Sequence, residues 1–450
     1  MKLFSDLTIK FEKPNWAKNP EFGLLDTILE QRPDMLDIIK ADVIGRNKNN
    51  GFGRGDVPSI EQIMRAAIYK EFKGLDYREL EYAQSDSRIC ALFLKIDELR
   101  PYSFQMYQKY ISRISEDSLQ KLLIELNKIA INEGIEDLEK IREDSTVVDT
   151  NIHYPTNNSL VWDCIKTSHN LLNKLSEELP GLNYRNYLKS AKRTYYKINN
   201  TKGKGKGKQE KIRKLFVNQL ITFTKTINNL SNAVKKKSYC SIKAFVIISE
   251  IESFIPMCNK VFSQTQRFQI YDEKVSNSEK IFSIYEPHTD LIVKGSREIK
   301  FGHKIDISGG KSNLILDCDI LTGNVADSKL FEPAIRRITK NYGKIPKSVC
   351  TDGGYASKVN RDFALSAGIK NIVFNKIVGS LKNIVSSKNM ETRLKKWRSG
   401  MEAVISNLKR GFNLRMINWS GFKHFKSKVL WSVIAYNIRV MTGHILVDLK

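Results

Sequence analysis

Ser348-Val-Cys-Thr-Asp352-Gly-Gly-Tyr355 is the stretch that decides the fold, because it has the pattern of a short buried strand ending in a carboxylate and a turn. Small and β-branched apolar residues lead up to Asp352, and the two glycines after it favour a tight turn. Strand-like and helix-like segments alternate around it, which predicts a mixed α/β sheet covered by helices. The neighbouring strands are predicted at 299–307, 313–320 and 370–374, and the neighbouring helices at 328–341, 356–367 and 392–412.

A second β-rich stretch, Asp144-Ser-Thr-Val-Val-Asp149-Thr-Asn-Ile152, lies far upstream of Asp352. Helical spacing fills most of the chain between them, so one strand of the sheet is separated from the others by a helical insertion. No internal repeat is visible. The predicted segments are 1–57 (poorly patterned), 58–135 (a helical domain), 136–165 (first part of the sheet domain), 166–285 (a basic helical insertion), 286–440 (second part of the sheet domain) and 441–450 (a tail).

The positive charge of the chain is concentrated in two blocks. The formal net charge is +25, with 74 Lys and Arg against 49 Asp and Glu. Residues 189–243 hold 16 basic residues and one acid, and residues 376–428 hold 13 basic residues and two acids. Such blocks favour binding of a polyanion, although a solvated surface or a disordered segment has the same composition. Four lysines that alternate with glycine predict a mobile, phosphate-binding loop. They are Lys202, Lys204, Lys206 and Lys208.

The composition argues against several classes of protein. A chain of 450 residues with 41% hydrophobic and 27% charged residues is globular, and its length suggests two or three domains. No apolar run approaches the ~20 residues of a membrane helix, and the start of the sequence turns polar too soon for a secretory signal. The six cysteines show neither a C-x-x-C pair nor a zinc-ligand spacing. We therefore expect a cytoplasmic protein with reduced thiols and no membrane contact.

Three acidic residues are candidates for a metal site. Asp144 starts the first strand, Asp352 ends a later strand, and Glu402 lies on the predicted helix 392–412 inside the second basic block. Ligands of α/β sheets gather at strand ends. Carboxylates that converge beside cations are explained by bound Mg²⁺, which prefers oxygen ligands. Two such ions about 3.5–4 Å apart can promote displacement at a phosphodiester.

Each of these acids also has an ordinary structural interpretation. Asp144 can be a surface strand residue, Asp352 a turn former before glycine, and Glu402 an exposed helix residue. Asp149 competes with Asp144, because side chains five positions apart on a strand face opposite sides and only one can reach the site. Two further acids flank a predicted turn and are interpreted as structural. They are Asp319 and Asp327.

The helix predicted to carry Glu402 places two cations on the same side. At about 100° per residue, Arg398 lies about 40° and Lys409 about 20° from Glu402 around the helix axis. An apolar stripe runs beside them, so the three polar residues line one edge of the buried face. A metal-binding acid between two phosphate-binding cations would have this arrangement. The structural alternative is an exposed i,i+4 pair of Arg398 and Glu402, which contributes about 0.3–0.5 kcal/mol.

These motifs together resemble the DDE transposases of bacterial insertion sequences. Arg398-x3-Glu402-x6-Lys409 is similar to the family's Y-x2-R-x3-E-x6-K signature, with Lys395 at the tyrosine position. Asp352-Gly-Gly-Tyr355 matches the segment around the family's second aspartate, and Asp144-Ser-Thr-Val-Val resembles the segment around the first. The helical segment 58–135 resembles the domain that precedes the family's catalytic core.

The resemblance implies a fold, a site and a reaction. The implied fold is an RNase H-like mixed α/β sheet flanked by helices, with an N-terminal all-α domain and a helical insertion. Asp144, Asp352 and Glu402 would form the catalytic, metal-binding triad, and Arg398 and Lys409 would hold phosphates near the cleaved bond. The implied cofactor is Mg²⁺, with Mn²⁺ as a substitute. The implied reaction is hydrolysis at the transposon ends, which frees a 3′-OH, and then attack of that hydroxyl on target DNA.

The implied partner is double-stranded DNA, at the transposon ends and at the target, bound by a homodimer or larger oligomer in the bacterial nucleoid. The 189–243 block is predicted to clamp this DNA, and segment 58–135 to read the ends. The alternative is a catalytically inactive, transposase-derived DNA-binding protein. A structural RNA-binding protein is a weaker alternative, since no aromatic-rich strand of the RNP type appears. The end sequence, target preference, strand-processing route and subunit number stay open.

Overall fold

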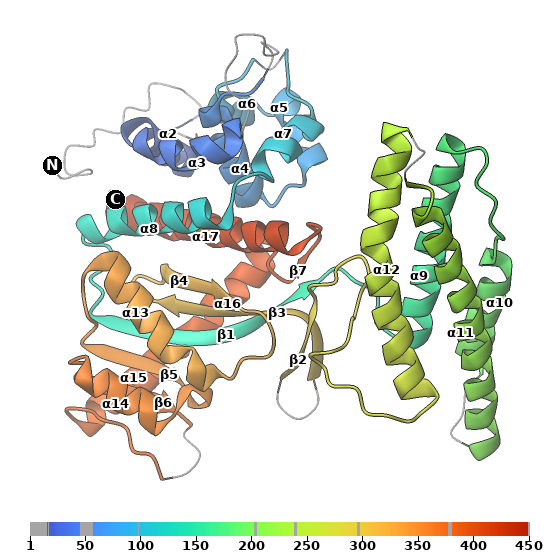
Figure 1. The fold of residues 1–450 in the computed structure, drawn as a ribbon. Helices are drawn as coiled ribbons and strands as arrows, with labels where there is room; N and C mark the ends of the chain where they lie inside the picture. The colour runs from blue at the N-terminus through green and yellow to red at the C-terminus, as the bar shows by residue number, and fades with distance from the viewer. Residues whose placement is uncertain are drawn as a thin grey trace. The chain divides into compact units, whose positions relative to one another are not determined.

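The computed structural model describes residues 16, 18–45, 57–97, 99–201, 205–237, 241–294, 298–376 and 380–448. The chain forms two compact units (Figure 1). The sheet unit combines the chain up to Thr150 with the chain from Ile292 onward, and the insertion unit is Asn151–Leu291. The chain therefore leaves the sheet unit after one strand and returns to it, as an insertion requires.

The sheet unit is built on a mixed sheet. The described residues give seven strands in the order β2-β3-β1-β5-β6, with β4 paired to β3 and β7 paired to β1. β1 runs antiparallel to β3 and parallel to β5, and β5 runs parallel to β6. The predicted mixed α/β sheet is therefore confirmed. The strands are β1 (Lys140–Thr150), β2 (Asp290–Lys294), β3 (Glu298–Gly309), β4 (Ile315–Ile320), β5 (Ser348–Asp352), β6 (Asn371–Asn375) and β7 (Met416–Ile417).

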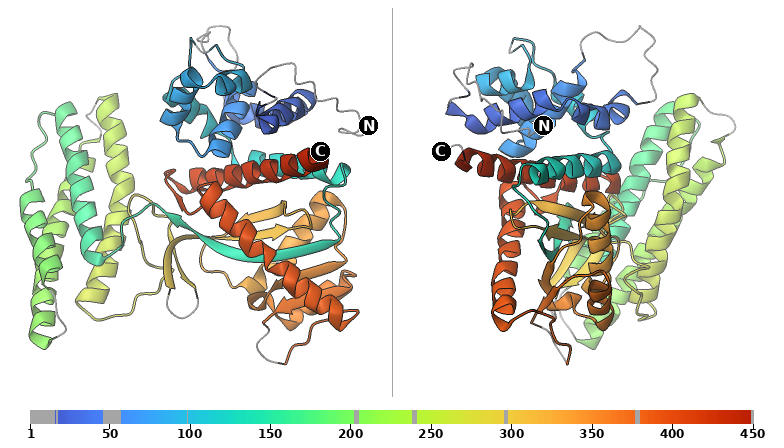
Figure 2. Two further views of the ribbon diagram at one scale, coloured as in Figure 1. Left: turned by 180° about the vertical axis from the view of Figure 1, so that it is seen from behind. Right: turned by 90° about the vertical axis from the view of Figure 1, so that its left-hand side faces the viewer.

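Helices cover both faces of this sheet. In Figures 1 and 2, α13 (Phe331–Tyr342) crosses one face and α16 (Gly400–Gly411) crosses the opposite face. Apolar residues at helical spacing explain the packing of α13, since Phe331, Ile335 and Ile338 are all buried against the sheet core. The remaining elements here are α14 (Lys358–Ser366), α15 (Lys388–Arg398) and the 3₁₀ turns Asp327–Lys329 and Gly353–Tyr355.

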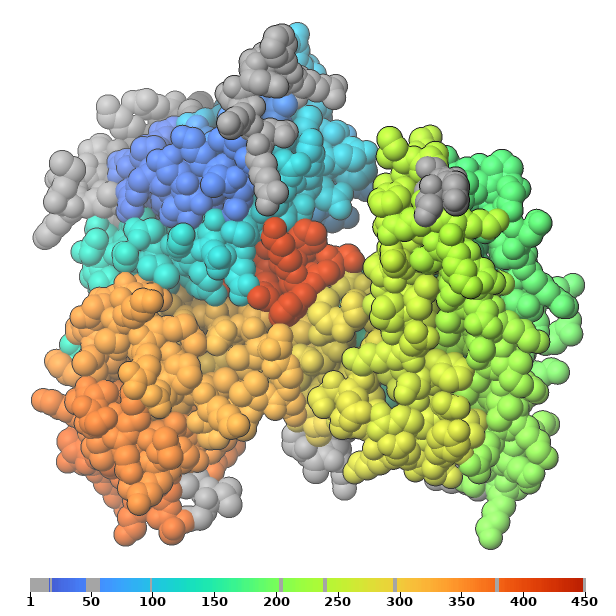
Figure 3. Space-filling view, viewed as in Figure 1, coloured from blue at the N-terminus to red at the C-terminus, as the bar shows by residue number. Residues whose placement is uncertain are grey.

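The N-terminal helices share one core with α17 (Phe422–Asp448), which the sequence analysis did not predict. α17 packs against α8, α4, α2 and β4. On the face shown in Figure 3 it appears as a patch between the N-terminal helices and the sheet. These helices are α2 (Pro20–Gln31), α3 (Asp34–Ile44), α4 (Ile60–Lys73), α5 (Tyr77–Asp86), α6 (Arg88–Leu94), α7 (Phe104–Ile111) and α8 (Glu116–Asn132).

Two terminal segments differ from the prediction. The segment 1–57, read as poorly patterned, contains α2 and α3, and the predicted tail 441–450 continues α17 to Asp448. Both are ordered by tertiary packing: Leu24 and Ile39 are buried in the shared core, and so is Met441. Phe422–Val447 is also long and apolar enough to cross a membrane, but 67% of its most apolar window is buried inside the protein. Its composition is therefore explained by its place in the core.

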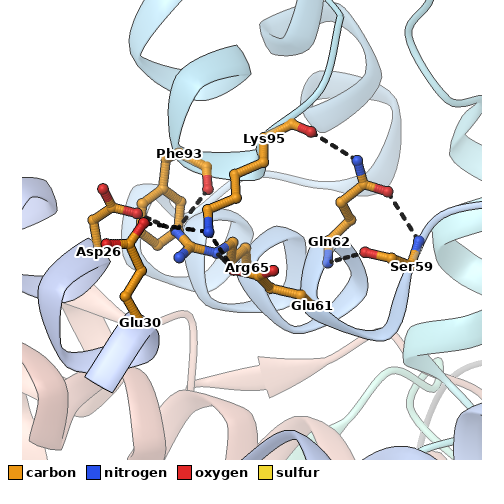
Figure 4. A network of polar contacts seen from close by, with 8 residues as sticks. All are labelled: Asp26, Glu30, Ser59, Glu61, Gln62, Arg65, Phe93 and Lys95. Atoms are coloured by element: carbon orange, nitrogen blue, oxygen red, sulfur yellow. Dashed lines mark hydrogen bonds and ion pairs between the residues drawn. The ribbon is translucent and has the colours of Figure 1, made fainter. Parts of the chain in front are cut away.

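A buried arginine ties α2, α4 and α6 together (Figure 4). Arg65 donates from Nη1 to Asp26 at 2.6 Å and to the carbonyl of Phe93 at 3.0 Å, and from Nε to Glu61 at 2.8 Å. Lys95 extends the network with an ion pair to Glu61 at 2.7 Å. A charge buried this deeply is tolerated because carboxylates and a carbonyl surround it.

The insertion unit is a helical bundle with a core of its own. Its helices are α9 (Asn157–Glu178), α10 (Leu188–Asn200), α11 (Lys206–Val234) and α12 (Ile242–Gln269). Leu172, Phe223 and Ile248 are fully buried between them. Within the described residues, α9 packs on the other three helices. The insertion therefore begins after Thr150, earlier than the predicted residue 166, because the first half of α9 supplies part of this core.

The lysine-glycine loop is shorter than predicted. Lys206 and Lys208 lie in the first turn of α11, after the N-cap Gly205, whereas Lys202 and Lys204 lie outside the described residues. α11 is held by the burial of Phe216 in the bundle. A helix once formed extends cheaply, since each added residue gains a hydrogen bond, and this extension outweighs the local preference of glycine for a loop.

Candidate active site

β1 presents Asp144 to the face of the sheet covered by α15 and α16. The sequence analysis placed Asp144 at the start of a strand, but β1 begins at Lys140 and Asp144 lies in its middle, paired across to Ile307 of β3. Its neighbour Glu143 points to the opposite face, since side chains alternate along a strand. The position of Asp144 is therefore set by its pairing with β3, directly after the residues of β1 that also pair with β5.

Asp352 stands at the carboxyl end of β5, as predicted. The glycine that follows is required by close packing: a Cβ on Gly353 would lie 2.5 Å from the carbonyl oxygen of Lys376 and 2.7 Å from that of Asn375. Tyr355 then turns inward and donates its hydroxyl to Asp306 at 2.6 Å. The Asp-Gly-Gly-Tyr sequence thus anchors the end of the strand and leaves Asp352 at its edge.

Arg398 and Glu402 lie on either side of an elbow between two helices. The single helix predicted at 392–412 is divided, because α15 ends at Arg398 and α16 begins at Gly400. Ser399 keeps a helical conformation, and Glu402 bonds back to its carbonyl at 3.1 Å. The predicted side-by-side placement of Arg398 and Glu402 survives the break, since their ion pair measures 3.0 Å.

The structure brings all three candidate acids to the guanidinium of Arg398. Nη2 lies 2.7 Å from Asp144 Oδ2, and Nη1 lies 3.0 Å from Glu402 Oε1 and 3.9 Å from Asp352 Oδ1. The Arg398 side chain is 5% exposed, whereas Asp352 and Glu402 are 43% and 66% exposed. We call these four residues the Arg398 cluster. It is anchored inside the protein by Arg398 and Asp144 and opens to solvent at Asp352 and Glu402.

The guanidinium of Arg398 is nearly buried and is engaged by carboxylates. The phosphate-binding role that the resemblance implies for Arg398 stays a prediction. The pair of Arg398 and Glu402 is not the exposed i,i+4 pair of the structural alternative, because one partner is buried and a third residue on a distant strand shares it. In this arrangement Arg398 holds the carboxylates of Asp144 and Glu402 in one place.

The donor chemistry of the cluster suits a hard divalent cation, since carboxylate oxygens are the ligands that Mg²⁺ takes. Among the described residues, however, no three His, Cys, Asp or Glu side chains are grouped closely enough to hold a metal ion. The guanidinium lies where the carboxylates approach one another. A cation would therefore bind through the exposed carboxylates of Asp352 and Glu402, which side-chain rotation can move, together with Asp144.

A basic groove of about 530 Å³ lies beside the cluster and shares Glu402 with it. Lys409 of α16 lines this groove, as does Asp149 of β1. Burial raises the pKa of Asp149 in spite of nearby Lys300, Lys409 and Arg415. The two aspartates of β1 are thus separated: Asp144 joins the Arg398 cluster, and Asp149 lies in the groove. The other groove residues are Val147, Glu298, Ile405, Ser406 and Arg410.

A second group of acids, which sequence reasoning missed, is buried on the other face of the sheet. Glu143 and Asp306 are almost completely buried, and burial is the main cause that raises the pKa of both, that of Asp306 to about 7. Asp317 pairs with Arg337 at 2.7 Å, yet burial still raises its pKa. Asp306 and Asp317 lie in predicted strands whose alternation indicates their face, whereas Glu143 precedes the first predicted strand.

The two acids interpreted as structural have structural partners. Asp319 forms an ion pair with Arg337 at 3.1 Å, and Asp327 pairs with Lys304 and accepts a hydrogen bond from Ser145 at 2.9 Å. Neither contacts Arg398 through any bond described. Both therefore stay outside the Arg398 cluster.

The insertion unit carries its own basic groove of about 650 Å³ between α10 and α11. Its cations are Arg193, Lys197 and Lys211, and the exposed ring of Tyr196 lies among them. Lys206 and Lys208 are exposed at the start of α11. These described cations of the first basic block therefore lie on the surface of a folded bundle.

Comparison with known proteins bears on the sheet unit. Residues 307–438 match the family model of the transposase DDE domain. The match includes Asp352, Arg398, Glu402 and Lys409 and excludes Asp144, which precedes it. Comparison with curated proteins and with solved structures gives no match. The second segment of the sheet unit thus resembles a transposase DDE domain, and this supports a transposase function.

Proposed function

We propose that this chain is a DDE transposase that cuts transposon ends and joins them to target DNA. The observation that carries the proposal is the Arg398 cluster: three acids from β1, β5 and α16 meet at one guanidinium at the edge of a basic groove. The family match over the second segment of the sheet unit is independent support, since it was found from sequence alone. The proposed core is RNase H-like, which agrees with the mixed sheet.

Each residue of the site has a proposed role. Asp144, Asp352 and Glu402 are the catalytic carboxylates and would hold Mg²⁺, with Mn²⁺ as a substitute. The bound ions would polarise the phosphodiester and lower the pKa of a water or hydroxyl nucleophile. Arg398 fixes Asp144 and Glu402 relative to each other. Lys409 and the groove cations hold the phosphates of the strand that enters the site.

Both proposed reactions are displacements at a phosphodiester, so one site serves both. In the first, water attacks at the transposon end and leaves a 3′-OH. In the second, that 3′-OH attacks a target phosphodiester and forms the new bond as the target strand is cut. Between the two reactions the groove cations keep the cleaved transposon end bound, because the phosphates that they contact are not altered by the first reaction.

The other parts of the chain have proposed roles in DNA binding. The insertion unit clamps DNA through the 189–243 block, including Lys202, Lys204, Lys206 and Lys208. The N-terminal helices, within 58–135, read the transposon ends. The active form is a homodimer or larger oligomer on DNA, in a bacterial cytoplasm. Deletion of 202–208 should reduce affinity for duplex DNA and flatten its salt dependence. An unchanged salt slope would refute the clamp.

The direct test uses purified protein, Mg²⁺ and DNA that carries the inverted repeats flanking its gene. Wild type should cleave at the repeats and join them to target DNA, whereas Asp352→Asn and Glu402→Gln should not. Glu391→Gln is a matched control, because Glu391 lies on α15, pairs with Lys395 at 2.6 Å and is no part of the cluster. Equal activity of all variants would show that the catalytic assignment is wrong.

The alternative of an inactive, transposase-derived DNA-binding protein predicts a different result. It would bind DNA in a salt-dependent way and show no metal-dependent cutting. The cluster has an intact set of carboxylates, which favours the active enzyme.

A further inference from the structure

We propose that Arg142 is a positioning residue: it ties the elbow between α15 and α16 to β1 and so sets Glu402 opposite Asp144. The inference rests on the proposed function, since it concerns the same carboxylates. Arg142 and Asp144 are two positions apart on β1 and therefore face the same side of the sheet. Neither the signature motifs nor the family match includes Arg142.

The contacts of Arg142 converge on the elbow. Its Nη1 donates to the carbonyl oxygen of Trp397 at 2.7 Å, and its guanidinium carbon lies 4.9 Å from the centre of the Trp397 ring. Trp397 precedes Arg398, which bonds to Asp144. Two neighbouring side chains of β1 thus hold two consecutive residues at the end of α15.

Gly400 allows this approach. A Cβ at Gly400 would lie 2.2 Å from Nη1 of Arg142, closer than real side chains come. The first residue of α16 is therefore packed directly on the guanidinium, and Glu402 follows in the same turn. A side chain at position 400 would therefore force either the guanidinium of Arg142 or the start of α16 to shift.

The other end of the guanidinium is anchored as well. Nη2 donates to Oδ1 of Asn313, in the turn between β3 and β4, and the Asn313 carbonyl accepts from Tyr436 of α17 at 3.1 Å. Arg142 is thus fixed to the sheet and to α17 as well as to the elbow. The elbow cannot shift without breaking these bonds.

Arg142 is an unusual cation. It is 2% exposed, and within the described residues its hydrogen bonds go to neutral oxygens, with no ion pair to a carboxylate. A buried charge without an acid partner costs stability. Its planar guanidinium supplies N–H donors at fixed angles to one another, and these reach the elbow and the β3–β4 turn together.

The test measures metal binding as well as activity. Arg142→Ala should weaken Mn²⁺ binding, followed by electron paramagnetic resonance, and raise the Mg²⁺ midpoint for DNA cleavage, each by about 10–100-fold, the range for residues that orient metal ligands. Arg142→Lys should recover part of both, because an ammonium can reach the Trp397 carbonyl but not both acceptors at once. Unchanged midpoints in a folded Arg142→Ala protein would overturn the inference.

Arg439→Ala is the matched control. Arg439 also donates to a backbone carbonyl, that of Phe72 at 2.8 Å, and its guanidinium lies 4.3 Å from the Phe72 ring. It also lies 4.9 Å from the ring of Phe412, at the end of α16 away from the elbow, and no described bond joins it to residues 397–400. This variant should lose stability and keep both metal midpoints. Equal shifts in Arg439→Ala and Arg142→Ala would mean that Arg142 acts only through general stability.

Gly400→Ala gives a second, independent test. Alone it should weaken Mn²⁺ binding, because the new methyl group displaces the elbow, whereas in an Arg142→Ala background it should add little. Such non-additivity, measured also on the urea unfolding midpoint, is expected for residues in direct contact. Additive effects would overturn the inference. If the wild type neither binds Mn²⁺ nor cuts DNA, the proposed function fails, and the unfolding cycle alone then decides whether Arg142 holds the elbow.

Discussion

Arg65 and Arg398 are both buried arginines that pair with carboxylates, and they differ in how far those carboxylates are exposed to solvent. Around Arg65, Asp26 and a backbone carbonyl are buried with the guanidinium, and Glu61, about one-third exposed, pairs with its Nε (Figure 4). Around Arg398, the outer carboxylates of Asp352 and Glu402 reach solvent. The Arg65–Asp26 pair is closed to solvent and ties α2 to α4, whereas the exposed carboxylates around Arg398 can exchange partners with a ligand.

This difference shows how similar interactions serve structure in one place and chemistry in another. A buried ion pair that is fully closed contributes order, and breaking it leaves an unpaired charge. An ion pair with an exposed rim keeps carboxylates in fixed positions while water or a cation can reach them. Exposure of the acids, more than the presence of the arginine, therefore distinguishes the two.

The largest expected effect separates the acids of the two networks. Asp352→Asn should lower DNA cleavage by at least about 100-fold, since even residues that only support metal ligands contribute 10–100-fold, with little change in the unfolding midpoint. Asp26→Asn should do the reverse: it destabilises the N-terminal helices and leaves cleavage per folded molecule unchanged. Cleavage rates and urea unfolding of both variants are the measurements. Full activity of Asp352→Asn would contradict the comparison.

The next effect concerns the arginines themselves. Arg65→Met should lower the free energy of unfolding by about 3–5 kcal/mol, because Asp26 is left buried without its partner. Arg398→Met should cost less, about 1–3 kcal/mol, because water can solvate Asp352 and Glu402. Urea denaturation followed by circular dichroism compares them. A larger loss for Arg398→Met would show that its network is closed in solution.

The buried acids Glu143, Asp306 and Asp317 extend the comparison, because they outnumber the cation that pairs with them, Arg337. Asp306 has its pKa raised to about 7 in the folded protein, mainly by burial, against 3.8 as its ordinary value. The folded state therefore binds more protons than the unfolded state between these values, and this contribution to stability is lost as pH rises from about 4 to 7. Relative to wild type, Asp306→Asn should gain stability between pH 5 and pH 8.

Urea midpoints at the two pH values check this, with Asp362→Asn as the control, because Asp362 is half exposed on α14. If the difference between wild type and Asp306→Asn does not change with pH, Asp306 does not titrate in this window.

The smallest effect lies at the rim of the Arg65 network. Lys95 and Glu61 are both about one-third exposed, so Lys95→Met should lower the free energy of unfolding by only about 0.2–1 kcal/mol, and by less in 1 M salt. Unfolding at low and high salt measures it. A loss as large as that of Arg65→Met would mean that the rim is as important as the buried centre.

Much of the sheet was predictable because its strands are short apolar runs bounded by turn residues. The strand that ends at Asp352 and the helix that became α13 follow from local patterns. The strands β2 and β7 were missed, and β7 is only two residues long, too short to show a pattern. α17 was also missed, since a helix that is apolar on nearly every side has no periodic signal.

The candidate site was predicted in part. The spacing of Arg398 and Glu402 indicated that they would lie together, and their ion pair follows from that spacing. The contributions of Arg142 and Gly400 could not be predicted, because each depends on which segment packs against β1.

The sequence by itself determined the local features of this protein: where the strands end, which helix faces are apolar, and where positive charge is concentrated. These depend on neighbouring residues and on periods of two or 3.6, which a linear pattern contains. Only the tertiary structure decided that Asp144 rather than Asp149 meets Arg398, and that Arg398 also contacts Asp352 of a different strand. Strand register and the contact of distant segments set these outcomes, and they depend on packing across the whole core.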